Sequence, residues 1–117
     1  MQYLLLIYSN EALTQNFSRA DGEAMMSEYR TYTESIAKSG HYKGGNRLQP
    51  IASATTVRVR DGKRQTTDGP FAETREQLGG YYLIEAKDLD EARSIAARIP
   101  GAKTGSIEVR PVVNMSR

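Results

Sequence analysis

The chain has 117 residues, of which 26% are charged, and its formal net charge at pH 7 is +2. This length suits one domain with a buried core, so we expect a single domain over residues 1–117. Because the sequence contains no cysteine, disulfides, thiolate catalysis and cysteine-ligated metals are excluded. The small positive charge gives no reason to expect a nucleic-acid partner.

The longest apolar run, residues 3–8, is far too short to span a membrane. It also lacks the basic start, long apolar middle and small-residue cleavage site of a secretory signal. We therefore expect a cytoplasmic protein with no membrane contact.

The same run, YLLLIY, is apolar at every position, which predicts a strand covered on both faces. Residues 9–20 are polar without a clear period, which is typical of a connecting loop. A helix is predicted over 22–39, capped at its start by Asp21 or Ser18 and ended by a glycine at position 40. Its apolar stripe consists of Met25, Tyr29, Tyr32 and Ile36.

A β-hairpin is the clearest local prediction. Residues 54–60 alternate with period two, Asp61-Gly62 is a favoured two-residue turn, and residues 63–67 return. The glycine-bearing segment 41–50 before it is predicted to be a connection, with a short strand at 47–49.

The second half repeats the order strand, helix, strand. A strand is predicted over 80–86, and Asp88 with Glu91 forms a capping box for the next helix. Pro100-Gly101 ends that helix, and the last strand is predicted over 106–113, followed by a polar tail. The buried stripe of this helix is Leu89, Ala92, Ile95, Ala96 and Ile99.

Together these elements predict an α+β, ferredoxin-like antiparallel sheet with two helices on one face and an inserted β-hairpin. Two helices cover only one face of such a sheet, although its strands are apolar on both. A second copy of the chain is the natural cover for the other face, so we expect a homodimer packed sheet against sheet.

The stretch from Thr66 to Glu85 is the most distinctive part of the sequence, with a turn at Asp68-Gly69-Pro70 and a glycine pair at the mouth of a strand. It resembles the DGPF-domain proteins, a branch of the YCII-related (YciI-like) family. The resemblance also includes Leu5–Tyr8, Leu48–Pro50, Ala54–Arg58, Asp88–Ala92, Ala97–Pro100 and Gly105–Pro111.

The resemblance implies a dimeric α+β barrel. Most members have no established activity, and some YciI-type relatives look like small lyases or isomerases of aromatic degradation, with a His and an Asp in a cleft. At the helix position where those relatives carry His, this sequence has Tyr29. Members of the DGPF branch are often encoded beside extracytoplasmic-function sigma factors, which suggests such a partner.

Asp68 is the first candidate catalytic residue. A carboxylate near a cleft can serve as general acid or base, but Asp before Gly-Pro is also ordinary turn chemistry. Arg58 lies in the middle of a predicted strand, where it can hold an anionic ligand and pair with Glu85 or Asp68. The other cations of the hairpin are read as a solvated face.

Three tyrosines and the single histidine are further candidates. Tyr29 and Tyr32 can line a pocket and donate a hydrogen bond, or pack in the core with the hydroxyl at its edge. Tyr81 and its neighbour Tyr82 alternate, so one faces the helices and the other the dimer partner. His41 can contact a ligand or stabilise a helix end as a cation.

No second histidine or spaced carboxylate pair supports a metal site, and we expect no cofactor. Two functions follow. The first is a small cofactor-independent enzyme of lyase or isomerase type, acting on a small acidic or aromatic molecule between sheet and helices. The second is a non-catalytic ligand-sensing or regulatory module that uses the same cleft and works with a sigma factor.

Overall fold

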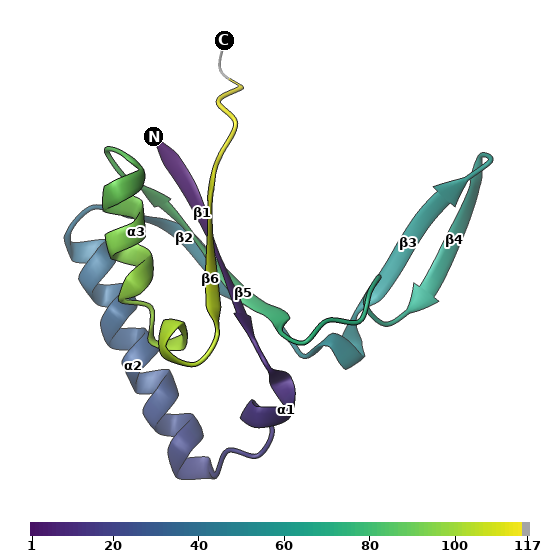
Figure 1. Cartoon of the computed structure of the whole chain (residues 1–117), viewed down its shortest axis with the longest axis horizontal. Coiled ribbons are helices and arrows are strands. Elements are labelled where there is room, and N and C mark those ends of the chain that lie inside the picture. The colour runs from purple at the N-terminus through teal and green to yellow at the C-terminus, as the bar shows by residue number, and fades with distance from the viewer. Residues whose placement is uncertain (116–117) are drawn as a thin grey trace.

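The computed structural model describes residues 1–115, so the last two positions of the predicted tail lie outside it. A four-stranded antiparallel sheet forms the body of the α+β fold, in the order β2-β5-β1-β6 (Figure 1). Its strands are β2 (Tyr42–Arg47), β5 (Gln77–Glu85), β1 (Gln2–Ser9) and β6 (Ser106–Pro111).

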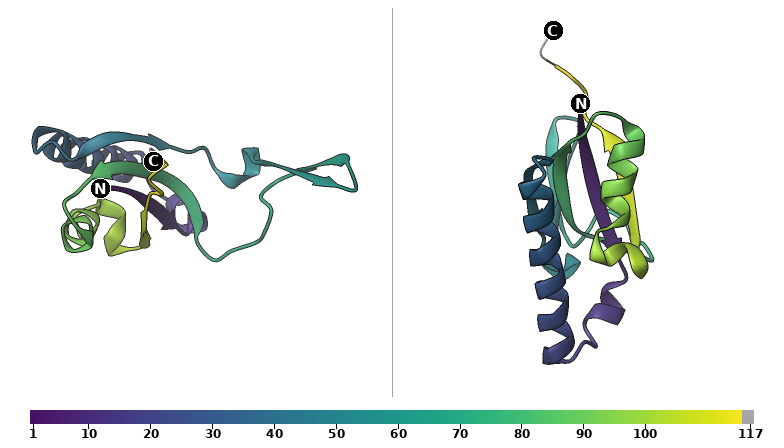
Figure 2. Two further views of the ribbon diagram at one scale, coloured as in Figure 1. Left: turned by 90° about the horizontal axis from the view of Figure 1, so that it is seen from above. Right: turned by 90° about the vertical axis from the view of Figure 1, so that its left-hand side faces the viewer.

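Two helices, α2 (Arg19–Lys38) and α3 (Leu89–Ala97), cover one face of this sheet (Figure 2). The core lies between these helices and the sheet, and the central strands contribute alternate residues to it. Its fully buried side chains include Leu5, Ile36 and Ile84. Three one-turn segments complete the helical structure: α1 (Glu11–Thr14), η1 (Ile51–Ser53) and η2 (Pro100–Lys103).

On the other face of the sheet, residues 1–115 place no helix. It carries a row of apolar and aromatic side chains from the two central strands, all only partly exposed. We call this surface the open face. It consists of Leu4, Leu6, Tyr8, Tyr81 and Leu83.

The predicted hairpin forms a separate two-stranded sheet of β3 (Thr55–Arg60) and β4 (Lys63–Asp68), which we call the arm. Its turn residues Asp61 and Gly62 both have positive φ, at 53° and 72°, as a tight hairpin turn requires. The arm stands away from the body on the side opposite the helices (Figure 2). The radius of gyration is accordingly 16.3 Å, against about 13 Å for a compact chain of this length.

A β-bulge interrupts the pairing of β1 with β5. Ile7 lies opposite Gly80, whereas the next residue, Tyr8, lies opposite Leu78. Gly79 is therefore an extra residue in β5, and the three positions before Gly80 are displaced in the alternation of the strand.

Most local predictions are confirmed. Ser18 caps α2, because its side chain accepts the backbone N–H of Asp21, and Gly40 follows the helix with φ of 84°. Asp88 caps α3 in the same way by accepting the N–H of Glu91.

Two predicted connections are wrong. The segment 9–20, expected to be a loop, contains α1 and the start of α2, while the segment 42–47 is the edge strand β2. The strand in this segment therefore lies at 42–47, before the short strand expected at 47–49. Among residues 1–115, no helix is long and apolar enough to cross a membrane.

Candidate functional site

The two charged candidates both lie on the arm, but they point to opposite faces of it. Asp68 is the last residue of β4 and pairs with Thr55, whereas Arg58 pairs with Gln65. Within the described residues neither side chain makes a hydrogen bond or an ion pair. Glu85, one predicted partner of Arg58, instead pairs with the amino group of Met1.

The tyrosines of α2 are held by the core. The hydroxyl of Tyr32 donates to the carbonyl of Ile95 at 2.9 Å, and its ring meets that of Tyr82 edge to face. The hydroxyl of Tyr29 accepts the N–H of Gly101 at 3.2 Å. Burial raises the pKa of Tyr29 and of Tyr32, so both phenols stay protonated near neutral pH.

Tyr81 and Tyr82 alternate as predicted. Tyr82 is 8% exposed and packs toward the helices, where its hydroxyl lies 2.6 Å from Thr33 Oγ1. Tyr81 belongs to the open face, and its hydroxyl accepts a hydrogen bond from Asn46. The space between sheet and helices, where we expected a ligand, is filled by the core.

His41 links the end of α2 to the start of α3. Its Nδ1 lies 2.7 Å from Ser39 Oγ, and its Nε2 lies 3.3 Å from the Glu91 carboxylate. That carboxylate also accepts the backbone N–H of Lys87, and this bond, with the nearby imidazole, lowers the pKa of Glu91. The structure therefore gives His41 a role in joining two helices and places it apart from the other candidates.

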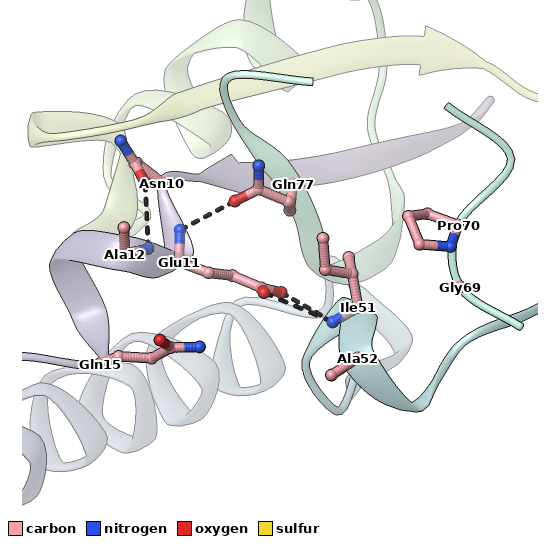
Figure 3. A pocket seen from close by; sticks show the side chains of 9 residues that line it. All are labelled: Asn10, Glu11, Ala12, Gln15, Ile51, Ala52, Gly69, Pro70 and Gln77. Atoms are coloured by element: carbon pink, nitrogen blue, oxygen red, sulfur yellow. Dashed lines mark hydrogen bonds between the residues drawn. The ribbon is translucent and has the colours of Figure 1, made fainter. Parts of the chain in front are cut away.

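An open cleft of about 420 Å³ lies instead at the root of the arm (Figure 3). Its walls are α1, the η1 turn and the Gly69-Pro70 turn that follows Asp68. We call it the α1 cleft. It is lined by Asn10, Glu11, Ala12, Gln15, Ile51, Ala52, Gly69, Pro70 and Gln77.

Hydrogen bonds of Glu11 hold the walls of the α1 cleft together (Figure 3). The Glu11 carboxylate accepts the backbone N–H of Ile51 at 3.1 Å, and the Glu11 N–H donates to Gln77 Oε1 at 2.9 Å. The Asn10 side chain caps α1 by accepting the N–H of Ala12. The side-chain amide of Gln15 makes no hydrogen bond to any described residue and remains available to a ligand.

The electrostatics of the α1 cleft favour hydrogen-bond donors over anions. Glu11 is its single ionisable lining residue; Asp68 precedes Gly69 in the chain but does not line the cleft. The alanines, Ile51 and Pro70 supply an apolar surface. Among residues 1–115 no group of three or more His, Asp or Glu side chains is arranged to hold a metal ion.

A second groove of about 410 Å³ runs between α2 and Arg98 on the helical side of the molecule. The Arg98 guanidinium lies over the Tyr32 ring, 5.8 Å from its centre, and donates to Ser35 Oγ. These contacts tie α3 to α2. The predicted candidate Tyr32 lines this groove, whereas none of the predicted candidates lines the α1 cleft. We select the α1 cleft because one of its walls is the Gly69-Pro70 turn that directly follows Asp68.

The sequence comparisons agree with one another. The sequence model of the YCII-related domain matches residues 1–116. The chain belongs to the YCII-related family. It is also similar to an uncharacterised protein of Rhizobium meliloti (strain 1021), with 39% identity over 114 residues, covering 96% of this chain and 92% of that protein.

In this YCII-related protein, sequence reasoning missed the polar residues of the α1 cleft. Glu11 and Gln15 precede the arm by 44 and 40 positions, Gln77 follows it by nine, and no spacing motif joins the three residues. One local signal was present, because Asn10 before Glu11-Ala12 is a typical start of a helical turn. It locates α1 but gives no hint of its neighbours η1 and β5.

Proposed function

We propose that this YCII-related protein is a homodimer that binds a small molecule in the α1 cleft. The observation that carries the proposal is the cleft itself, a hollow of about 420 Å³ walled by the turn at Gly69-Pro70. Its walls are fixed by the bonds from Glu11 to Ile51 and Gln77, so the cleft is largely preformed, as small-molecule sites usually are.

The open face supports the dimer. Leucines and tyrosines lie there in a continuous row on two paired strands, and no helix or strand of the described residues covers them. Isolated surface apolar residues need no explanation, but a contiguous patch marks an interaction surface. Two copies packed through this face would form the dimeric α+β barrel on a ferredoxin-like sheet that the family resemblance implies.

The lining chemistry indicates the class of ligand. A molecule with hydroxyl or amino groups can donate to the Glu11 carboxylate and to the free amide oxygen of Gln15. An apolar ring or chain would lie against Ile51, Ala52 and Pro70. The acidic ligand predicted from sequence would need a cation here, and Arg58 lies on the arm rather than in the cleft.

Binding without chemistry, as in a ligand-sensing or regulatory module, is the function that these contacts support best. One observation favours a second candidate, a lyase or isomerase. The Asp68 side chain makes no hydrogen bond or ion pair within the described residues, and Asp68 directly precedes Gly69 of the cleft wall in the chain, so it is the carboxylate that we assign to move a proton of a bound molecule. A sigma-factor partner stays a prediction from the family resemblance.

A thermal-shift screen tests the binding proposal. The protein would be screened against phenols, catechols, lactones, small amines and small carboxylates, together with Ala52→Trp, which fills the cleft. Ala24→Trp, at an exposed position of α2, is the matched control. Compounds bearing hydroxyl or amino groups should stabilise the wild type and Ala24→Trp but not Ala52→Trp; equal stabilisation of all three proteins would rule out the cleft as the site.

A turnover assay with Asp68→Asn then separates the two candidate functions. Any compound that binds would be incubated with each protein and followed by NMR for conversion. Product formed by the wild type and lost in Asp68→Asn, with binding retained, identifies an enzyme with Asp68 as proton carrier. Binding without conversion by either protein identifies the non-catalytic module.

A further inference from the structure

Within residues 1–115, the arm has no support beyond its own two strands. Its two strands pair only with each other, and every residue of β4 is exposed. A two-stranded hairpin without a packed face is marginal in water. An arm held in this position therefore needs a surface to pack against.

One face of the arm is suited to such a contact. Val57 and Val59 lie on the same face of β3, and they are 57% and 62% exposed. The β4 residues on this face are Arg64, Thr66 and Asp68, so the face is apolar only along its β3 edge. The opposite face of the arm is polar and charged, and its residues are Thr56, Arg58, Arg60, Lys63, Gln65 and Thr67.

The position of the arm indicates its partner. The arm extends from the same side of the sheet as the open face, with both long helices on the other side (Figure 2). Packed sheets lie about 10 Å apart, and a six-residue strand spans about 20 Å. A second copy seated on the open face would therefore lie within reach of the arm along its whole length.

We propose that the arm packs its Val57–Val59 face against a second copy of this chain, and that this contact holds the α1 cleft in shape. The inference rests on the proposed homodimer and adds the exchange of arms to it. By the twofold symmetry of such a dimer, each copy gives one arm and receives one.

The link between arm and cleft is in the chain itself. The η1 turn, residues 51–53, leads directly into β3, and Gly69-Pro70 follows directly on β4. The two roots of the arm are joined by the bonds from Gly69 N–H to Ala54 and from Thr56 Oγ1 to the Gly69 carbonyl. Two walls of the α1 cleft are thus the segments at which the arm leaves the body. A contact that holds the arm in place therefore also holds these two walls in place.

Dimerisation without any ligand provides the first test. Val57→Asp adds a carboxylate to the apolar face of the arm, whereas Gln65→Asp adds one to the opposite face. The dimer Kd would be measured by sedimentation velocity over a concentration series. Val57→Asp should raise this Kd about tenfold or more, because a buried unpaired carboxylate is costly. Gln65→Asp should leave the Kd within about twofold of the wild-type value. Equal effects of the two variants, or none, would overturn the inference.

Hydrogen exchange followed by mass spectrometry provides the second test. In the wild-type dimer, amides of residues 55–68 and 51–53 should be protected, and Val57→Asp at a concentration where it is monomeric should lose that protection. Peptides from β1 and β5 should stay protected in both proteins, which shows that the body is folded. A dimer whose arm exchanges freely would refute the arm contact and leave the homodimer standing, whereas a wild type that is monomeric throughout would refute both.

Discussion

The carboxylate of Glu11 and the backbone nitrogen of Ile51 lie 3.1 Å apart and form a hydrogen bond, although 40 positions separate them. Through this bond α1, which follows the first strand, is tied to η1, which precedes the arm. The same residue uses its backbone N–H to bind Gln77 at the start of β5. Glu11 thus ties three segments together: α1, η1 and the start of β5.

Removal of this carboxylate should destabilise the protein. Glu11→Ala leaves the Ile51 N–H without its partner, and the free energy of unfolding should fall by about 1–3 kcal/mol. Glu11→Gln keeps an acceptor oxygen and should cost less than Glu11→Ala. Urea unfolding followed by circular dichroism measures both, with Glu34→Gln, at an exposed position of α2, as the control. A Glu11→Ala variant as stable as the wild type would contradict this role.

The buried hydroxyl of Tyr32 should contribute to stability through its bond to the Ile95 carbonyl. Tyr32→Phe removes that bond and leaves a buried carbonyl with one partner fewer, at an expected cost of about 1 kcal/mol. Tyr42→Phe is the matched control, because the Tyr42 ring also packs on Tyr82 but its hydroxyl bonds no described residue. In thermal and urea unfolding, the stability of Tyr42→Phe should be near that of the wild type. A larger loss of stability for Tyr42→Phe than for Tyr32→Phe would refute the role of the Tyr32 hydroxyl.

The lowered pKa of Glu91 predicts a pH dependence of stability. Because the bond from the Lys87 N–H and the nearby His41 favour the charged carboxylate in the folded state, its contribution is present above the ordinary glutamate pKa. It is lost as the pH falls through the lower pKa of the folded state. Unfolding free energies measured from pH 7 to pH 3 should therefore converge for wild type and Glu91→Gln. A gap between the two that widens on acidification would contradict the sign.

Two glycines should respond to alanine in opposite ways. At Gly105 an added Cβ would lie 2.1 Å from the carbonyl oxygen of Tyr8, so Gly105→Ala should destabilise the fold by about 1–3 kcal/mol or more. At Gly22, inside α2, a Cβ meets nothing within 4 Å, and Gly22→Ala should stabilise the protein by about 0.5–1 kcal/mol. Differential scanning calorimetry of both variants checks the two signs together.

The parts of the fold that follow from local rules were predictable. The hairpin turn at Asp61-Gly62, the cap at Ser18 and the capping residue Asp88 each act within a few positions, so the sequence carries the full signal. The strand over 42–47 was missed because YKGGNR has no alternation. It is a strand because β5 binds its backbone, and at Gly45 a Cβ would lie 2.8 Å from the Tyr81 carbonyl.

The candidate site was less predictable, because its parts meet only in the folded chain. The turn at Asp68-Gly69-Pro70 stands out in the sequence, and it does form one wall of the α1 cleft through Gly69 and Pro70. Glu11 gives no signal in the sequence because α1, with four residues, is too short to show a helical period. Tyr29 and Tyr32 were predicted either to line a pocket or to pack in the core; the Tyr32 hydroxyl binds Ile95 of α3 and the Tyr29 hydroxyl binds Gly101 of η2.

The extra residue at Gly79 has a consequence for how this strand can change by insertion or deletion. Because Gly79 has no partner on β1, losing it would remove the bulge and leave every pair in place, with Tyr8 opposite Leu78 and Ser9 opposite Gln77. The hydrogen bond from the Glu11 N–H to Gln77 would therefore survive a one-codon deletion at the bulge. The same deletion within residues 80–85, where every residue is paired, would turn one end of the strand by half a cycle.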